Sequence, residues 1–290
     1  MSLDQRCDGK ENCHDGSDEE DCKAFITFPG YKKWLAPPPL GNESTLMINV
    51  SIIIDDIIAI DENNGLFKTK ITLIRNWLNP QLTYQNLKRE ISKNQVSTKD
   101  KGRMWKPWTI FRNIEHEGAV KFTNEQRDKM TIIPNPSFKY QTTGREQIQN
   151  TRLFKGTENI ISYLRQMSVP WLCVYDMRWY PFDTQICTME LIPSDSSVTL
   201  NPTYVNYSGP MQLTQHFVKE VTICPFMFQD KPGIIVEVIL GRPIFCTILS
   251  VFMPTSILLL LSQIVKVFGE NHLEMVIEVN LTLLLVLATL

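Results

Sequence analysis

From residue 46 to residue 241, the apolar residues follow strand-like rather than helical spacing. Segments 47–60 and 66–78 are the longest of these. They flank residues 61–65, whose Asn-Gly dipeptide favours a hairpin turn. Shorter strand-like segments are 131–133, 160–167, 171–176, 186–192, 216–223 and 234–240. Many short strands separated by turns predict a mainly β fold, a sandwich over residues 46–241.

The pattern changes at residue 243, where an uncharged apolar stretch begins and runs to residue 265. A helix of that length would cross the hydrocarbon core of a bilayer, which is about 30 Å thick. Residues 279–290 form a second apolar run, which as a helix would cover roughly 18 Å. We therefore expect a membrane region over 242–290, with a first helix at 243–265 and the start of another at 274–290. The second run stops at the last residue and the N-terminus lacks the features of a signal peptide, so we expect a chain cut at both ends.

Composition and motifs narrow the function classes. A net charge of -2 over 290 residues gives no indication of nucleic-acid binding. The four histidines are scattered, and no hydrolase, zinc-protease or phosphate-loop motif occurs, so an enzyme is not expected. Glycosylation sequons at Asn42, Asn49 and Asn206 all precede the apolar stretch, which favours an extracellular location for that part. A fourth sequon, at Asn280, lies in an apolar run and is expected to stay unmodified.

The first 23 residues are rich in acids and contain the cysteines Cys7, Cys13 and Cys22. They resemble the second half of a low-density-lipoprotein-receptor class A repeat, whose first three cysteines are missing here. The resemblance implies a Cys7–Cys22 disulfide and a calcium site, since calcium prefers carboxylate and carbonyl oxygens. The implied metal positions are Asp8, Asn12, Asp18 and Glu19, although the family has an acid in place of Asn12. The alternative is an acidic, solvated tail, joined to the sandwich by a linker over residues 24–45.

Cys173 and Cys187 bracket a loop that contains the sequence Tyr-Pro-Phe-Asp at residues 180–183. The loop, the sandwich and the apolar stretch together resemble the Cys-loop pentameric ligand-gated ion channels. Trp108 departs from the family, which has Asp there, whereas other positions match: Trp77, Trp105, Pro107, Arg242 and Pro254. The resemblance implies a Cys173–Cys187 disulfide and an immunoglobulin-like extracellular β-sandwich followed by transmembrane helices. The alternative is an unrelated disulfide hairpin in a single-pass membrane protein.

Members of that family bind small ligands between subunits, often in an aromatic cage that holds an amine. The resemblance places five residues at ligand-binding positions: Thr72, Arg112, Ser194, Phe226 and Phe228. The first three replace aromatic residues of the nicotinic members, and Cys224 lacks the adjacent cysteine of their vicinal pair, so acetylcholine is not the expected ligand. Arg112 would favour an anionic ligand, or would form a surface salt bridge. The two phenylalanines would either face the ligand or pack within a hairpin.

By the same resemblance, the Cys173–Cys187 loop would pass motion from the ligand interface to the membrane helices. The implied coupling residues are Tyr180, Pro181, Phe182, Asp183 and Arg242. Among them, Asp183 and Arg242 are the candidate ionic partners.

A stripe of residues near the C-terminus recurs at spacings of four, four, three and four, which places it on one face of a helix: Glu274, Glu278, Thr282, Leu285 and Thr289. By the resemblance these residues would line a pore. The two acids would form rings that favour cations, and Leu285 would form a hydrophobic gate. The alternative is that the acids belong to an ordinary solvated loop end.

The leading hypothesis is a subunit of a homo- or hetero-pentameric ligand-gated ion channel, leaning cation-selective. It would lie in the plasma membrane with its N-terminal region outside, and a small-molecule ligand at the sandwich interface would open the pore. The alternative is a non-conducting ligand-binding or adhesion-type accessory subunit. Beyond calcium in the N-terminal repeat, no cofactor is expected.

Overall fold

The computed structural model of the chain describes residues 5, 11–18, 24–122, 128–136, 153–229, 231–268 and 281. Two compact units divide the chain. The first unit comprises Met1–Val174, Cys187–Pro210 and Val221–Val238. The second unit comprises Tyr175–Ile186, Met211–Glu220 and Ile239–Leu290.

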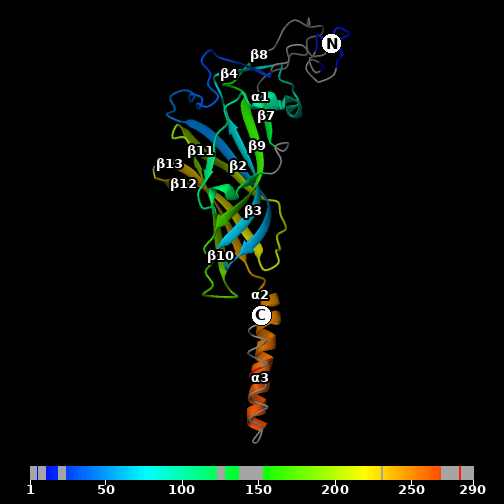
Figure 1. Cartoon of the computed structure of the whole chain (residues 1–290), viewed down its shortest axis with the longest axis vertical. Coiled ribbons are helices and arrows are strands. Elements are labelled where there is room, and N and C mark those ends of the chain that lie inside the picture. The colour runs from blue at the N-terminus through cyan, green and yellow to red at the C-terminus, as the bar shows by residue number, and fades with distance from the viewer. Residues whose placement is uncertain are drawn as a thin grey trace. The chain divides into compact units, whose positions relative to one another are not determined.

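The larger sheet has the strand order β11-β2-β3-β9-β6, and β7 also pairs with β9. Five of these strands, β2, β3, β7, β9 and β11, are labelled in Figure 1. β2 and β3 form a long antiparallel hairpin. Gly65 occupies its turn with a φ of 65°, a conformation that residues with a Cβ rarely adopt. The strands of this sheet are β2 (Leu46–Asp61), β3 (Leu66–Trp77), β6 (Lys121–Phe122), β7 (Lys129–Ile133), β9 (Ile160–Leu172) and β11 (Val198–Tyr207).

A second, four-stranded sheet has the order β12-β13-β10-β5. Its strands are β5 (Thr109–Phe111), β10 (Thr184–Pro193), β12 (Phe217–Phe228) and β13 (Lys231–Gly241). A third sheet of three short strands consists of β1 (Phe25–Thr27), β4 (Leu82–Gln85) and β8 (Leu153–Lys155). Short helical turns between the strands are η2 (Ile91–Asn94), α1 (Thr98–Lys101) and η3 (Glu117–Ala119).

The core lies between the two larger sheets. In β2, every second residue from Ile48 to Ile54 is buried, as the two-residue period of a strand requires when one face is apolar. Trp171 of β9 meets Phe111 of β5 edge to face, with the ring centroids 5.5 Å apart. Burial of such side chains stabilises a fold by about 1.5–3 kcal/mol each. These contacts confirm the predicted mainly β, sandwich-type fold.

The chain is helical from Ile244 to Phe268, through α2 (Ile244–Thr247), a π-helical turn (Ile248–Phe252) and α3 (Met253–Phe268). Pro254 has no N–H to donate to the carbonyl of residue 250, which lies inside the π-helical turn. A π-turn widens the helix at such a point. Within the described part of the chain, no single helix is both long enough and apolar enough to cross a membrane.

Two strand predictions were wrong in detail. Segments 160–167 and 171–176 are not separate strands, because β9 runs unbroken from Ile160 to Leu172 and ends there. Pro170 is tolerated inside it for a geometric reason. Its carbonyl accepts a hydrogen bond from the N–H of Glu115, so its missing N–H also faces that side and leaves the ladder to β3 intact. Other strands were not predicted at all: β1, β4, β5, β6, β8 and the long β11.

Candidate functional sites

The loop predicted between Cys173 and Cys187 is closed by a disulfide, with the two Cα atoms 5.1 Å apart. The N–H of Cys173 donates to the carbonyl of Gly65, which ties this cysteine to the β2–β3 turn. Cys187 is fully buried in β10. The disulfide therefore joins the end of β9 to the start of β10 within the first unit.

Inside the second unit, Arg242 and Asp183 form a buried ion pair. The Nε of Arg242 donates to both carboxylate oxygens of Asp183, at 2.8 and 3.0 Å. Only 7% of Arg242 and 5% of Asp183 is exposed. The guanidinium also lies 4.8 Å from the centre of the Tyr180 ring. Gln185 donates its side-chain amide to the same carboxylate.

The surroundings of Asp183 favour its charged form. Burial by itself opposes ionisation, but the hydrogen bonds from Arg242 and Gln185 outweigh it and hold the pKa of Asp183 below its usual value of 3.8. Removing one partner of such a pair leaves an uncompensated buried charge. Pro181 is buried, whereas Phe182 is exposed. Of the predicted coupling residues, Asp183 and Arg242 thus form a buried charge pair with Tyr180 against it, and Arg242 stands just before Pro243 and α2 in the sequence.

Two of the five predicted ligand-binding residues meet in the first unit. The guanidinium of Arg112 lies 3.4 Å from the centre of the Phe228 ring, a close cation–π contact. Its Nη1 is 3.5 Å from Oε2 of Glu190, and the backbone N–H of Arg112 donates to the carbonyl of Glu190. The predicted surface salt bridge of Arg112 is therefore present. Glu190 was missed in the sequence, because its meeting with Arg112 depends on the pairing of β5 with β10.

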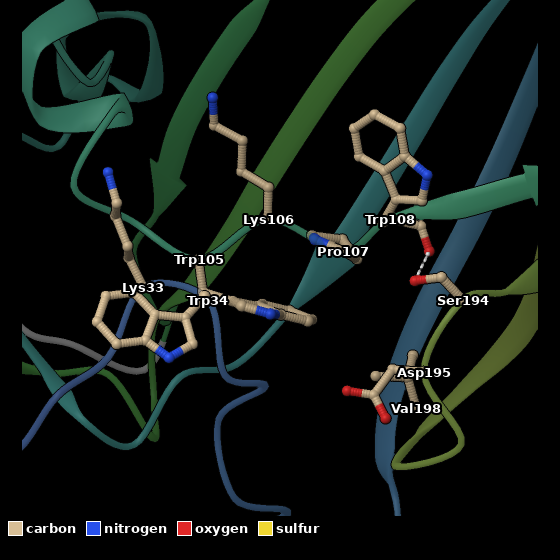
Figure 2. A pocket seen from close by; sticks show the side chains of 9 residues that line it. All are labelled: Lys33, Trp34, Trp105, Lys106, Pro107, Trp108, Ser194, Asp195 and Val198. Carbon is tan, nitrogen blue, oxygen red and sulfur yellow. Dashed lines mark hydrogen bonds between the residues drawn. The ribbon is translucent and has the colours of Figure 1, made fainter.

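Ser194 lies elsewhere, at a small pocket of about 160 Å³ (Figure 2). Both its hydroxyl and its N–H donate to the carbonyl of Trp108, at 3.1 and 3.2 Å. Trp108, which departs from the family pattern, is 66% exposed at the rim. In Figure 2, Ser194 and Asp195 lie on one side of this pocket and Lys33 and Trp34 on the other. Trp34 gave no signal in the sequence that would have placed it here.

Thr72 and Phe226 make contacts within the subunit: Thr72 forms a hydrogen bond, and Phe226 packs in a hairpin. The hydroxyl of Thr72 donates to Oδ2 of Asp55 at 2.7 Å, and Gln166 donates to the same oxygen. The ring of Phe226 lies over Gly233, where a Cβ would be only 2.6 Å from Phe226 Cε1. This contact between β12 and β13 is the hairpin packing given as the alternative for Phe226.

In the N-terminal segment, Asp18 is buried and acts as an acceptor within a turn. Its carboxylate accepts from the N–H of Asn12 at 2.5 Å and of Cys13 at 3.2 Å. Burial opposes its ionisation, but these backbone hydrogen bonds lower its pKa overall. Among the described residues, no cluster of three His, Cys, Asp or Glu side chains suits a metal ion. The remaining residues of the predicted repeat, Cys7, Asp8, Glu19 and Cys22, lie outside the described residues.

The predicted pore stripe also lies outside the described residues: Glu274, Glu278, Thr282, Leu285 and Thr289. The three sequon asparagines are described. Asn42, Asn49 and Asn206 are all exposed, Asn49 on β2 and Asn206 on β11.

With this geometry in place, comparison with known proteins identifies the family. Residues 26–209 match the neurotransmitter-gated ion-channel ligand binding domain. The chain belongs to this family. The matched residues include Arg112, Ser194 and the whole Cys173–Cys187 loop. Members of the family of neurotransmitter-gated ion channels are not enzymes.

Similar curated proteins are subunits of acetylcholine receptors. The chain is 20% identical over 173 residues to neuronal acetylcholine receptor subunit beta-3 of Gallus gallus, which covers 60% of this chain and 32% of that protein. It is 21% identical over 185 residues to acetylcholine receptor subunit beta-type unc-29 of Caenorhabditis elegans, covering 61% of this chain and 30% of that protein. The chain spans about a third of the length of the curated relatives it matches.

Proposed function

We propose that this chain is part of a subunit of a ligand-gated ion channel of the plasma membrane, with the β-sandwich outside the cell. The observation that carries the proposal is the match of residues 26–209 to the neurotransmitter-gated channel ligand binding domain, together with the disulfide-closed loop inside it. In this proposal, five such subunits assemble and bind a small-molecule ligand at the interface between sandwiches. The helical segment that begins at Ile244 would be the first membrane helix.

The contacts of Arg112 bear on the class of ligand. Its guanidinium already covers the face of Phe228, the position where a ligand's cation would stack. The side chain of Arg112 is 38% exposed, so a cationic amine that approached this ring would be repelled by the like charge of the guanidinium. A carboxylate ligand, in contrast, would compete with Glu190 for the same guanidinium. We infer that this face of the subunit favours an anionic or zwitterionic ligand over a quaternary ammonium.

Opening would be transmitted through the Cys173–Cys187 loop. Asp183 belongs to this loop, and its buried partner Arg242 directly precedes Pro243 and α2 in the sequence. A ligand opens a pore only when it binds the open state more tightly than the closed state, so the loop must adopt two arrangements. The acidic residues Glu274 and Glu278 are the basis for proposing a cation-selective pore.

The ligand class is tested with the full-length protein in oocytes, by voltage clamp with acetylcholine, glutamate, glycine and γ-aminobutyrate applied singly. We expect currents from a carboxylate-bearing ligand, and a loss of at least about tenfold in its potency in Arg112→Gln. The control is Arg103→Gln, an exposed arginine paired with Asp100, which should leave potency unchanged. Potency for acetylcholine that exceeds that of all carboxylate ligands would contradict the inference.

A non-conducting accessory role is the second candidate, because only Arg112 and Phe228 of the five predicted ligand positions meet in the structure. An accessory subunit would be silent alone but would change the currents of a co-expressed acetylcholine receptor subunit. Surface-expressed protein that is silent alone, yet shifts the partner's dose–response curve, would favour this role over the ligand-gated homomer.

A further inference from the structure

A second pocket, of about 390 Å³, lies in the first unit, and neither Arg112 nor Phe228 lines it. Its volume is in the range of small-molecule sites, about 300–1,000 Å³. Most of its wall is apolar, formed by Leu73, Ile110, Phe111, Val120, Phe122 and Met167. These residues come from β3, β5, β6 and β9 and the segment between β5 and β6. An apolar wall of this kind suits the body of an organic molecule.

The wall also contains Arg75, a cation that is only 5% exposed. One of its nitrogens, Nη1, donates to the carbonyl of Pro107 at 2.7 Å, and its guanidinium lies 4.7 Å from the centre of the Tyr163 ring. Its Nε is buried without a hydrogen-bond partner among the described residues. Burial lowers the pKa of Arg75 to about 10, which reflects the cost of a desolvated cation. A buried charge that has no ion pair among the described residues is unfavourable, so the guanidinium of Arg75 has unused capacity for an anion.

Two further polar groups share this wall. The hydroxyl of Thr109 is buried and has no hydrogen-bond partner in the described part of the chain. Arg165 lies with its guanidinium 3.6 Å from the centre of the Phe122 ring, and its Nε is 3.5 Å from Oδ2 of Asp128. That carboxylate oxygen also accepts from Tyr163. One carboxylate thus contacts Arg165 and Tyr163, and its charge acts on Arg75 only from a distance. Among the described residues, Arg75 forms no ion pair of its own.

We propose that this pocket binds a small organic anion, in which a single carboxylate is attached to an apolar or aromatic body. The carboxylate would accept hydrogen bonds from Nε of Arg75 and the hydroxyl of Thr109, and charge-assisted bonds of this kind are the strong ones. The apolar wall would hold the rest of the molecule. The proposal goes beyond the ligand site at Arg112, since none of the residues of that contact lines this pocket.

The test measures the affinity of the purified 290-residue chain by isothermal titration calorimetry for three probes with the same body. These are 4-phenylbutyrate, 4-phenylbutan-1-ol and 4-phenylbutylamine. We expect the carboxylate to bind at least about tenfold more tightly than the alcohol, and the amine more weakly still. Arg75→Met should abolish the preference for the carboxylate over the alcohol, while the affinity for the alcohol stays unchanged.

Further variants keep the test decisive if Arg75→Met fails to fold. Thr109→Val should weaken the binding of phenylbutyrate but not of the alcohol. Val120→Trp, which fills the pocket, should weaken the binding of both probes. Arg103→Met is the matched control, an exposed arginine outside the pocket, and should change nothing. Equal affinity for all three probes, or no binding of any to the wild-type chain, would overturn the proposal. The proposal would also be overturned if Arg112→Met lost phenylbutyrate binding while Arg75→Met bound it as tightly as the wild type. The anion would then occupy the Arg112 site.

Discussion

At the scale of single residues, the Asp183–Arg242 pair is held from several sides. Arg242 donates to both carboxylate oxygens of Asp183, and its guanidinium lies against the Tyr180 ring. Gln185, two residues after Asp183, donates its side-chain amide to the same carboxylate. Because both charges are buried, neither can be solvated when the other is removed. A second ion pair on the same loop, Asp176 with Arg178, differs in being exposed. The two pairs allow a matched comparison.

Asp183→Asn should destabilise the chain by about 3–5 kcal/mol, because it leaves the buried guanidinium of Arg242 without a counter-charge. Asp176→Asn should leave the stability nearly unchanged, since exposed ion pairs contribute little. The thermal midpoint of each variant, followed by tryptophan fluorescence in detergent, checks both. Equal midpoints for the two variants would show that burial of the Asp183 pair contributes no special stability.

The same residue predicts a dependence on pH. The pKa of Asp183 is lower in the folded chain than its usual 3.8, so the stabilisation from its charge is fully present above about pH 4 and is lost as the pH falls through the lowered pKa. The thermal midpoint of the wild type should therefore fall more steeply between pH 5 and pH 2 than that of Asp183→Asn, to roughly the extent of this contribution. Parallel curves would mean that Asp183 does not carry the acid sensitivity.

At the scale of secondary-structure elements, the approach of β13 to β10 depends on a residue without a side chain. A Cβ on Gly233 would lie 2.7 Å from the carbonyl oxygen of Leu191 and 2.6 Å from the Phe226 ring. The first of these atoms belongs to the backbone of β10 and cannot move without shifting the strand. The close packing of the β12–β13 hairpin, which also carries Phe228 to Arg112, therefore requires glycine at this position.

Gly233→Ala should lower the free energy of unfolding by about 1–3 kcal/mol, the usual cost of overpacking. Gly102→Ala is its control, because a Cβ there meets only ordinary contacts at 3.4 Å or more. That substitution should be neutral or stabilise the chain by about 0.4–1 kcal/mol through the unfolded state. Thermal midpoints of both variants measure the difference. An unchanged midpoint for Gly233→Ala would indicate that β13 has room to move away from β10.

At the scale of the whole molecule, the proposal places the sandwich outside the cell. Three sequon asparagines are exposed on it or just before it: Asn42, Asn49 and Asn206. Their side chains are open to modification by the glycosylation machinery, which acts only on segments that enter the secretory pathway. Asn280 provides an internal comparison, because its sequon lies in the apolar run near the C-terminus.

In the full-length protein expressed in animal cells, peptide N-glycosidase should shift the electrophoretic mobility. The shift should shrink by one step in each of Asn42→Gln, Asn49→Gln and Asn206→Gln, and should be unaffected by Asn280→Gln. Surface biotinylation of the same cells confirms that the shifted form reaches the plasma membrane. A protein with no glycosidase-sensitive shift would place the sandwich on the other side of the membrane from the one proposed.

Local sequence patterns predicted the architecture and the family because both depend on signals that are close together in the chain. The cysteine spacing of the 173–187 loop, the strand-like segments and the uncharged stretch from residue 243 each predict structure without reference to distant residues. Pro170 and β11 were misjudged for the opposite reason. Whether a proline interrupts a strand depends on which side its nitrogen faces, and the parallel pairing of β11 with β2 joins segments about 150 residues apart.

Only the tertiary structure decided what surrounds each candidate site residue. The sequence named Arg112 and Phe228 separately, and strand pairing across the sheet placed the cation on the ring with Glu190 beside it. Arg75 was indistinguishable in the sequence from the exposed arginines, because its burial depends on residues 107–111 and 163–167 folding over β3. A charge gains its chemical role from the groups around it, and those groups are brought together by register and packing rather than by proximity in the sequence.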